Sequence, residues 1–466
     1  MKRKIQNILL IRPARTLPIS IKYQGVGEPL GILYIAAVLM KEGYKVSVFD
    51  ASSVDLIRQR GNYITYGSDC GGIKDAIRNI SPDIVGVSCF TSCSEFDLFE
   101  TCKAVKEVDE GIPVVVGGSH PTVFPERMLR KKYIDYVIMH EGEYRFLYLI
   151  DALNKNESDF KFDGIAYRKG DKIKVNPPNS WIEDLDSLPY PARELVEMGT
   201  YARLNEKYEK YGVTRPFKKG LILATRGCFN NCRYCFEYKF WGRKIRRRSV
   251  RNIIGEIRIL KENYGIEHIF FVDDNLSNSK IFMKELFRAL KKIRVKWSIP
   301  LGVYPPILDK EIIRLMFEAG AREIKLSIES GSKRVLKYIM HRNIDLDSIK
   351  EIVKECHKYG MKVYGSFVLG MIGETKQEIF QTLNFPNKIK LDGASFYIAL
   401  PIPGSDFYNE ALTKGYLSKP YNFRNLVMSD LSILRIPESS PDFSISTEEL
   451  RDLIVRKQND FSKIID

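Results

Sequence analysis

Short apolar runs alternate with helix-length segments through the first 153 residues of the chain. The segments between the runs, such as Leu30–Lys41 and Phe96–Val108, are long enough for helices. Continuously apolar strands that alternate with helices are typical of a parallel sheet covered on both faces. We therefore predict a doubly wound α/β domain over residues 1–153, with its ligand beyond the carboxyl ends of the strands. The predicted strands are Asn7–Ile11, Lys45–Phe49, Asp83–Val87, Val114–Val116 and Tyr136–Ile138.

A second alternating series fills residues 220–400. Helical patterns such as Val250–Lys261 and Lys310–Ala319 separate its apolar runs. Successive strand–helix units of this kind predict a partial α/β barrel, with its active site at the C-terminal ends of the strands. The six predicted strands are Leu221–Thr225, His268–Val272, Lys296–Leu301, Glu323–Ile328, Lys362–Leu369 and Ala394–Leu400.

Two shorter segments complete the predicted domain organisation. Residues 154–219 are interpreted as a linker that contains a hairpin turning at Gly170-Asp171 and several prolines that interrupt regular structure. Residues 401–466 are interpreted as a C-terminal extension, in which Thr447–Ser462 predicts a helix.

Composition restricts the class of protein. A chain of 466 residues with 44% hydrophobic and 28% charged residues is typical of a soluble globular protein of about three domains. The longest stretch without charge, Ile112–Pro125, has 14 residues, whereas a membrane-spanning helix needs about 20 apolar residues. The basic N-terminus has no secretory core or cleavage site after it. We expect a cytoplasmic protein without a membrane span.

The net charge of +15 suggests an anionic partner, although a lysine-rich solvated surface gives the same excess. Lys239–Arg251 concentrates seven basic residues in 13, beside Phe240 and Trp241. Such a segment could track the phosphates of a nucleic acid, hold a small anionic substrate or form a solvated face.

The cysteines carry the most specific signal. Eight in the whole chain are too few for a disulfide scaffold, but Cys228, Cys232 and Cys235 fall within eight residues, directly after the first barrel strand. Thiolates are the usual ligands of iron–sulfur clusters, and three of them leave one iron of a four-iron cube open to another ligand. Structural zinc normally takes four protein ligands, and no fourth lies nearby. The spacing predicts a 4Fe-4S cluster held by these three cysteines.

The spacing C-x3-C-x2-C, with Tyr234 before the last cysteine, resembles the signature of the radical S-adenosylmethionine (SAM) superfamily. Further segments at successive strand ends resemble the same family: Asp273-Asp274-Asn275, Ser327–Ser332, Gly370-x2-Gly373-Glu374-Thr375 and Pro401-x-Pro403-Gly404. The resemblance implies that SAM binds the open iron. It further implies that one electron from the cluster cleaves SAM and produces a 5′-deoxyadenosyl radical. It also implies a SAM site formed by Tyr234, Asp273, Ser327, Glu329, Arg342 and Leu369, with Arg342 at the carboxylate.

A doubly wound domain before such a barrel resembles the cobalamin-binding subclass, the class B radical SAM methyltransferases. The resemblance covers Pro29-Leu30-Gly31, Asp83–Ser88, Gly117–Thr122 and Glu141–Glu143. Small residues at these strand ends would let backbone amides approach a large ligand. The motif D-x-H-x-x-G is absent, so we do not predict histidine ligation of cobalt. The implied cobalamin-binding residues are Ser88, Cys89, Phe90, Thr91, Gly117, Gly118, His120, Thr122, Glu141, Gly142 and Glu143.

The resemblance implies a methyltransferase that uses two SAM molecules. One methylates reduced cobalamin, and the other gives the radical that removes hydrogen from an unactivated carbon, or acts at phosphorus, of a biosynthetic intermediate. The substrate would be a small molecule, and the basic segment favours an anionic one. The electron donor would be a protein such as flavodoxin or ferredoxin.

Three other functions share parts of this pattern. A non-methylating cobalamin enzyme, for cyclisation, ring contraction or carbon–carbon coupling, would use the same motifs. A transfer-RNA methylthiotransferase needs a second cysteine triad, and the spacing of Cys70, Cys89, Cys93 and Cys102 matches one poorly. We therefore do not expect a nucleic-acid partner. A non-enzymatic cofactor sensor would have no need of SAM motifs at successive strand ends.

Overall fold

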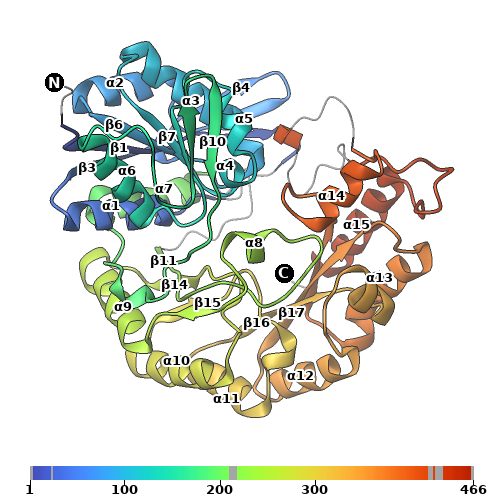
Figure 1. The fold of residues 1–466 in the computed structure, drawn as a ribbon. Coiled ribbons are helices and arrows are strands. Elements are labelled where there is room, and N and C mark those ends of the chain that lie inside the picture. The colour runs from blue at the N-terminus through green and yellow to red at the C-terminus, as the bar shows by residue number, and fades with distance from the viewer. Residues whose placement is uncertain (1–3, 22–24, 209–217, 418–422, 426–433, 463–466) are drawn as a thin grey trace. The chain divides into compact units, whose positions relative to one another are not determined.

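The computed structural model describes residues 4–21, 25–208, 218–417, 423–425 and 434–462. The chain divides into two compact units, residues 1–218 and 219–466 (Figure 1). Each unit has its own sheets and helices.

A seven-stranded sheet with the order β10-β9-β8-β7-β6-β1-β3 forms the centre of the first unit. The strands β3, β1, β6, β7 and β8 are parallel, and the hairpin β9–β10 extends the sheet in antiparallel pairing. The chain order reverses between β1 and β6, which is the point where open α/β sheets bind ligands. The strands are β1 (Asn7–Arg12), β3 (Lys45–Asp50), β6 (Ile84–Ser88), β7 (Val114–Gly117), β8 (Tyr136–Ile138), β9 (Ile165–Lys169) and β10 (Lys172–Asn176).

Helices cover both faces of this sheet. Alternate residues of each strand point to opposite sides, so apolar side chains on both faces need to be covered. Ile8 of β1 packs in one apolar cluster with Leu149, and Leu9 packs in the other cluster with Leu98. The doubly wound fold is thus confirmed, with α1 at the predicted bounds. The helices of the unit are α1 (Leu30–Lys41), α2 (Cys70–Ile80), α3 (Glu95–Val108), α4 (Ser119–Val123), α5 (Pro125–Leu129), α6 (Glu143–Asn154) and α7 (Met198–Lys207).

A small antiparallel sheet in the first unit was not predicted. It pairs β5 (Tyr63–Tyr66) with both β2 (Arg15–Pro18) and β4 (Ile57–Arg60). Thr16 anchors it to α3, since both its backbone N–H and its hydroxyl donate to the Asp97 carboxylate, at 3.0 and 2.6 Å.

Six parallel strands in chain order form the second unit. They lie in two three-stranded sheets, β11-β14-β15 and β16-β17-β18. Val303 bridges the two, since its N–H donates to Lys325 O at 2.8 Å and its carbonyl accepts from Ser327 N at 3.0 Å. The predicted partial barrel is confirmed. The strands are β11 (Lys219–Ile222), β14 (His268–Phe271), β15 (Lys296–Ser298), β16 (Glu323–Glu329), β17 (Lys362–Leu369) and β18 (Gly393–Ile398).

The helices after successive strands lie on the outside of the barrel strands (Figure 1). Each begins at a side-chain N-cap, which satisfies backbone N–H groups that have no partner within the helix. The caps are Ser249, Ser279, Asp309, Asp345 and Thr375. The helices are α9 (Val250–Tyr264), α10 (Lys280–Ile293), α11 (Lys310–Glu318), α12 (Leu346–Lys358) and α13 (Lys376–Ile389).

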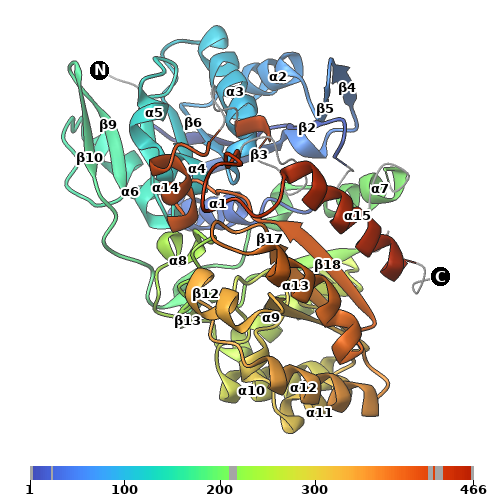
Figure 2. The same cartoon turned by 90° about the vertical axis from the view of Figure 1, so that its right-hand side faces the viewer.

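The C-terminal extension contributes α14 (Asp406–Thr413) and α15 (Thr447–Ser462), and the latter has the predicted bounds. Helix α15 lies along β18, where the Gln458 amide donates to Phe396 O at 3.0 Å (Figure 2). No helix within the described residues has the length and apolar character needed to cross a membrane.

Candidate active site

The three clustered cysteines lie in a loop directly after the short strand β12 (Thr225–Arg226), which pairs with β13 (Arg246–Arg247). Gly227 has φ +101°, and a Cβ there would lie 2.3 Å from Lys244 O. The Cys228 N–H donates to Gly242 O at 3.1 Å. The backbone of the basic segment therefore sets the start of the cysteine loop, and Gly227 is needed for the close approach.

Each cysteine sulfur accepts a hydrogen bond from a separate donor. Asn275 Nδ2 lies 3.9 Å from Cys228 Sγ, Arg342 Nη1 lies 3.4 Å from Cys232 Sγ, and Glu237 N lies 3.4 Å from Cys235 Sγ. Such donors stabilise thiolates and tune the potential of a bound cluster.

All three thiols are free. Burial raises the pKa of Cys228 and Cys235, and binding of a metal cation deprotonates cysteine thiols. Among the described residues, no three His, Cys, Asp or Glu side chains converge on a single metal position. A cubane does not require such convergence, because each cysteine ligates a different iron. The donor set therefore fits a cluster.

Arg342 is buried beside this loop. Its Nη2 donates to Ser327 O at 3.1 Å and lies 3.8 Å from Glu329 Oε1, and the guanidinium lies 5.0 Å from the centre of the Tyr304 ring. Its Nε has no hydrogen-bond partner in the described part of the chain. A buried donor without a partner costs about 1–3 kcal/mol, so this atom indicates the position of an absent acceptor, such as the carboxylate of SAM.

The structure brings Tyr234, Ser327, Glu329 and Arg342 together around Cys232. The Tyr234 side chain hydrogen-bonds to Glu329, and burial raises the pKa of that carboxyl. These are four of the six residues that the sequence predicted for SAM.

The other two, Asp273 and Leu369, have side chains that point elsewhere. Asp273 Oδ1 accepts from Thr225 N at 2.5 Å and from the Thr225 hydroxyl at 2.7 Å, which holds the turn before the cysteine loop. Burial raises the pKa of Asp273 to about 6. Leu369 is fully buried, and its carbonyl accepts from Ala399 N at 2.7 Å. A strand-end motif does not reveal these orientations.

Two residues near the cysteines were not selected from the sequence. Asn275 belongs to the segment Asp273-Asp274-Asn275, but its position beside Cys228 depends on the turn after β14. The Tyr304 ring packs edge-on against Phe229 of the cysteine loop, with 5.8 Å between the ring centres. The only sequence signal for Tyr304 is its position in the segment after the third barrel strand.

The basic segment 239–251 is largely engaged within the fold. Arg246 and Arg248 are buried, and Arg248 pairs with Glu256. Lys239 Nζ lies 2.6 Å from Asp406 Oδ1, and Arg243 donates to Asn231 at 2.9 Å. Much of the positive charge of this segment is thus engaged in contacts within the fold, which leaves less of it for the phosphate-tracking surface considered from the sequence.

In the first unit, the predicted cobalamin-binding loops follow β6, β7 and β8, which are neighbours in the sheet. Phe90 is 71% exposed at the end of β6, and Thr91 is exposed beside it. Gly118 has φ +106°, and a Cβ there would lie 2.5 Å from Cys89 O. The glycine therefore allows two loops of the protein to approach each other, whereas we expected it to allow the approach of a ligand.

Four of the predicted cobalamin-binding side chains are buried within the unit, namely Cys89, His120, Glu141 and Glu143. His120 Nδ1 lies 2.9 Å from the Ser92 hydroxyl, and Nε2 lies 3.1 Å from Glu95 Oε1. Glu141 Oε2 accepts from Ile182 N at 2.8 Å. His120 and Glu141 thus support the loops from within. Partly or fully exposed at this edge are Ser88, Phe90, Thr91, Gly117, Gly118, Thr122 and Gly142.

Comparison with known proteins agrees with both units. Residues 222–385 match the radical SAM superfamily, and residues 17–150 match the B12 binding domain. An uncharacterized methyltransferase of Pyrococcus horikoshii is 31% identical over 89% of this chain and 85% of its own. Cytidylyl-2-hydroxyethylphosphonate methyltransferase of Streptomyces wedmorensis is 29% identical over 99% of this chain and 90% of its own.

A solved structure shows the same fold. It is that of the radical SAM methyltransferase TsrM from Kitasatospora setae with cobalamin and a [4Fe-4S] cluster bound. The TM-score is 0.69 at 18% identity, and the match covers 89% of this chain and 80% of TsrM.

The chain therefore belongs to the radical SAM superfamily and carries a B12 binding domain. Within that class it is a cobalamin-dependent radical SAM methyltransferase. The predicted fold class is confirmed, and so are the predicted cofactors SAM and cobalamin. The predicted 4Fe-4S cluster agrees with the cluster bound in the TsrM structure.

Proposed function

We propose that the enzyme methylates an unactivated carbon, or a phosphorus atom, of a small biosynthetic intermediate. Both cofactor assignments fall on one chain, and the methyltransferase relative from Streptomyces wedmorensis spans 99% of it. The observation that carries the proposal is the buried Arg342, which donates to Cys232 Sγ and has an Nε without a partner among the described residues. The proposed cluster ligand Cys232 thus lies next to Arg342, whose Nε could donate to the carboxylate of SAM.

In this proposal Cys228, Cys232 and Cys235 hold the cluster, and Arg342 orients the SAM carboxylate. Bound cofactors supply the electron that cleaves SAM and carry the methyl group. The half-buried Tyr234 and the buried Glu329 form a polar wall beside Arg342 and help to exclude water from it. Asp273 acts indirectly, because it holds the turn that precedes Cys228.

The cobalamin site is proposed at the loops Ser88–Thr91, Gly117–Thr122 and Glu141–Glu143. The exposed Phe90 ring offers an apolar face for a large flat ligand, and aromatic rings contribute strongly to such contacts. His120 and Glu141 position these loops through Ser92, Glu95 and Ile182.

The acceptor is proposed to be a small molecule with an anionic group. The relative from Streptomyces wedmorensis is named for a nucleotide-linked phosphonate, and a TsrM structure contains tryptophan as substrate. We further propose a cytoplasmic location and an acidic electron donor such as flavodoxin or ferredoxin, which the net charge of +15 would attract.

Transfer of an isotopic label tests the proposal. The reduced, reconstituted enzyme is incubated with SAM carrying a deuterated methyl group and with a panel of phosphonates, nucleotides and amino acids. Label in a product carbon or phosphorus, together with S-adenosylhomocysteine and 5′-deoxyadenosine, supports methyl transfer. Conversion of an acceptor with 5′-deoxyadenosine but without label identifies a non-methylating cobalamin enzyme and refutes the proposal.

A further inference from the structure

The segment between Glu329 and Arg342 has an unusual backbone. A bulge in β16 precedes Glu329, which has φ +72°, and His341, just before Arg342, has φ +56°. Between them, Val335–Ile339 forms a π-helical turn. Conformations of this kind persist only where surrounding contacts impose them, and they concentrate at functional sites. Arg233 of the cysteine loop donates to Ile339 O and, through its N–H, to Met340 O. Several of the contacts that hold this segment come from α13.

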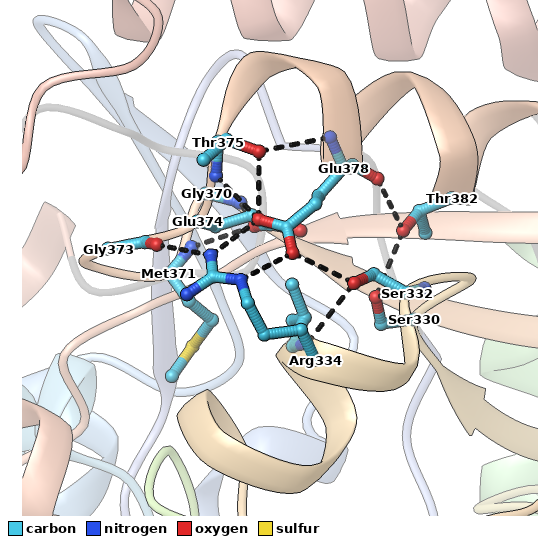
Figure 3. A network of polar contacts seen from close by, with 11 residues as sticks. Ser330, Ser332, Arg334, Gly370, Met371, Gly373, Glu374, Thr375, Glu378 and Thr382 are labelled. Carbon is cyan, nitrogen blue, oxygen red and sulfur yellow. Dashed lines mark hydrogen bonds and ion pairs between the residues drawn. The ribbon is translucent and has the colours of Figure 1, made fainter.

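One glutamate of α13 receives most of these contacts (Figure 3). Glu378 accepts from Arg334 Nε at 2.7 Å and from Arg334 Nη2 at 2.5 Å, which makes a bidentate ion pair. It also accepts from the Ser332 hydroxyl at 2.9 Å. Arg334 holds the pKa of Glu378 at about 2, so the pair stays ionised at any working pH.

A second set of contacts presses the same segment onto the helix (Figure 3). The buried Thr382 hydroxyl lies 3.0 Å from the Ser330 hydroxyl and accepts from Gly331 N at 3.0 Å. A Cβ on Gly331 would lie 2.8 Å from Gln381 O and 2.9 Å from Phe385 Cβ. Only glycine permits this close approach.

The first turn of α13 also holds the loop after β17 (Figure 3). Arg334 Nη2 donates to Gly373 O at 2.8 Å, and Glu378 completes a capping box with Thr375. Glu374 accepts from Gly370 N at 2.7 Å and from Met371 N at 3.1 Å. The pair Arg334–Glu378 is therefore the joint between two strand-end loops of the barrel.

We propose that Arg334 and Glu378, with Thr382, are positioning residues for SAM. They fix the segment Glu329–Arg342 against the loop that follows β17, and so set the place of the Arg342 guanidinium beside Cys232. This inference rests on the proposed function, because it takes Arg342 to be a SAM-binding residue.

The test measures SAM affinity and the response of the cluster in the reconstituted full-length enzyme. Arg334→Gln and Glu378→Gln are expected to weaken SAM binding by about 10- to 100-fold, the loss typical of groups that orient a ligand-binding residue. The KM for SAM should rise while kcat at saturating SAM stays within about twofold of wild type, because the chemistry is unchanged once SAM is placed. The change that SAM causes in the electron paramagnetic resonance spectrum of the reduced cluster should need correspondingly more SAM.

Two comparisons separate positioning from folding. Lys333→Gln is the matched control, since the neighbouring Lys333 forms an exposed ion pair with Asp347, and its SAM affinity should equal that of wild type. If an Arg334 or Glu378 variant loses iron, two variants of Thr382 replace it in the test. Thr382→Val keeps the shape of the side chain but lacks the hydroxyl, whereas Thr382→Ser keeps the hydroxyl. Weak SAM binding in the valine variant, with recovery in the serine variant, supports the proposal.

Wild-type SAM affinity in Arg334→Gln, or an equal loss in Lys333→Gln, overturns the inference and leaves the methyltransferase proposal intact. A fall in kcat with an unchanged KM for SAM also overturns it. Conversely, a wild-type enzyme that binds SAM but methylates no acceptor refutes the proposed function and leaves the inference standing.

Discussion

Arg342 Nη1 donates to Cys232 Sγ across 3.4 Å, and this contact joins a predicted cluster ligand to a predicted SAM-binding residue. The two lie 110 positions apart in the chain. The guanidinium is buried, so its charge is poorly screened by solvent.

Replacement of Arg342 should change the cluster as well as SAM binding. A positive hydrogen-bond donor beside a ligand sulfur favours the reduced cluster, so Arg342→Gln is expected to lower the reduction potential. Arg342→Lys keeps the positive charge but loses the planar guanidinium that can donate two hydrogen bonds to a carboxylate. This variant is therefore expected to lose more of its affinity for SAM than of its reduction potential. A redox titration followed by electron paramagnetic resonance gives the potential, with the exposed Arg314→Gln as control. An unchanged potential in Arg342→Gln would contradict the assignment of Cys232.

Loss of one cysteine should affect the two cofactors differently. Cys228→Ser, Cys232→Ser and Cys235→Ser are each expected to reduce iron and sulfide content sharply and to abolish SAM cleavage. Cobalamin retention should persist, because the proposed cobalamin loops belong to the other unit. Elemental analysis and absorption spectra provide the readout, and Cys70→Ser serves as control. Wild-type iron content in any of the three variants would remove that cysteine from the ligand set.

Two adjacent glycines give a matched test of the cobalamin loops. Gly118→Ala forces a Cβ to within 2.5 Å of Cys89 O at φ +106°, so it should cost at least about 1–2 kcal/mol and displace the loop. Gly117→Ala meets nothing closer than Ile138 O at 3.4 Å and should be tolerated. Cobalamin retained after gel filtration measures the effect. Equal retention by the two variants would argue against a cobalamin site at this edge.

Glu374 should make the enzyme less stable as the pH rises. Burial raises its pKa from 4.5 to about 8, so between these values the unfolded chain releases a proton that the folded chain keeps. The unfolding free energy therefore falls with pH across this window. Glu374→Gln cannot titrate, so its stability relative to wild type should increase from pH 5 to pH 9 in denaturant unfolding. The exposed Glu351→Gln should show no such trend above pH 6, and parallel curves for wild type and Glu374→Gln would refute the assignment.

The elements that the sequence predicted well depend on local signals. Thr447–Ser462 and Leu30–Lys41 have the expected bounds, and capping residues such as Ser249 and Asp309 start barrel helices. The strands of the small sheet escaped prediction because Ile57–Arg60 is mostly exposed and its pairing with Tyr63–Tyr66 is needed to define it.

The site shows the same division. The cysteine triad stands out by spacing alone, and its role as cluster ligand stays a prediction. Contacts between distant segments, such as Tyr304 against Phe229 or Arg334 against Glu378, leave no periodic pattern in the sequence. The sequence also does not show in which direction a side chain points at the end of a strand. His120 was predicted to bind cobalamin, and in the structure its ring is buried between Ser92 and Glu95.

One anaerobic experiment tests the central claim most directly. The protein is reconstituted with iron, sulfide and cobalamin, the cofactors are counted per chain, and SAM products are quantified after reduction. We predict a four-iron cluster, one tightly bound cobalamin, and formation of both S-adenosylhomocysteine and 5′-deoxyadenosine. A chain that retains no cobalamin, or that forms 5′-deoxyadenosine without S-adenosylhomocysteine, would contradict a cobalamin-dependent methyl transfer.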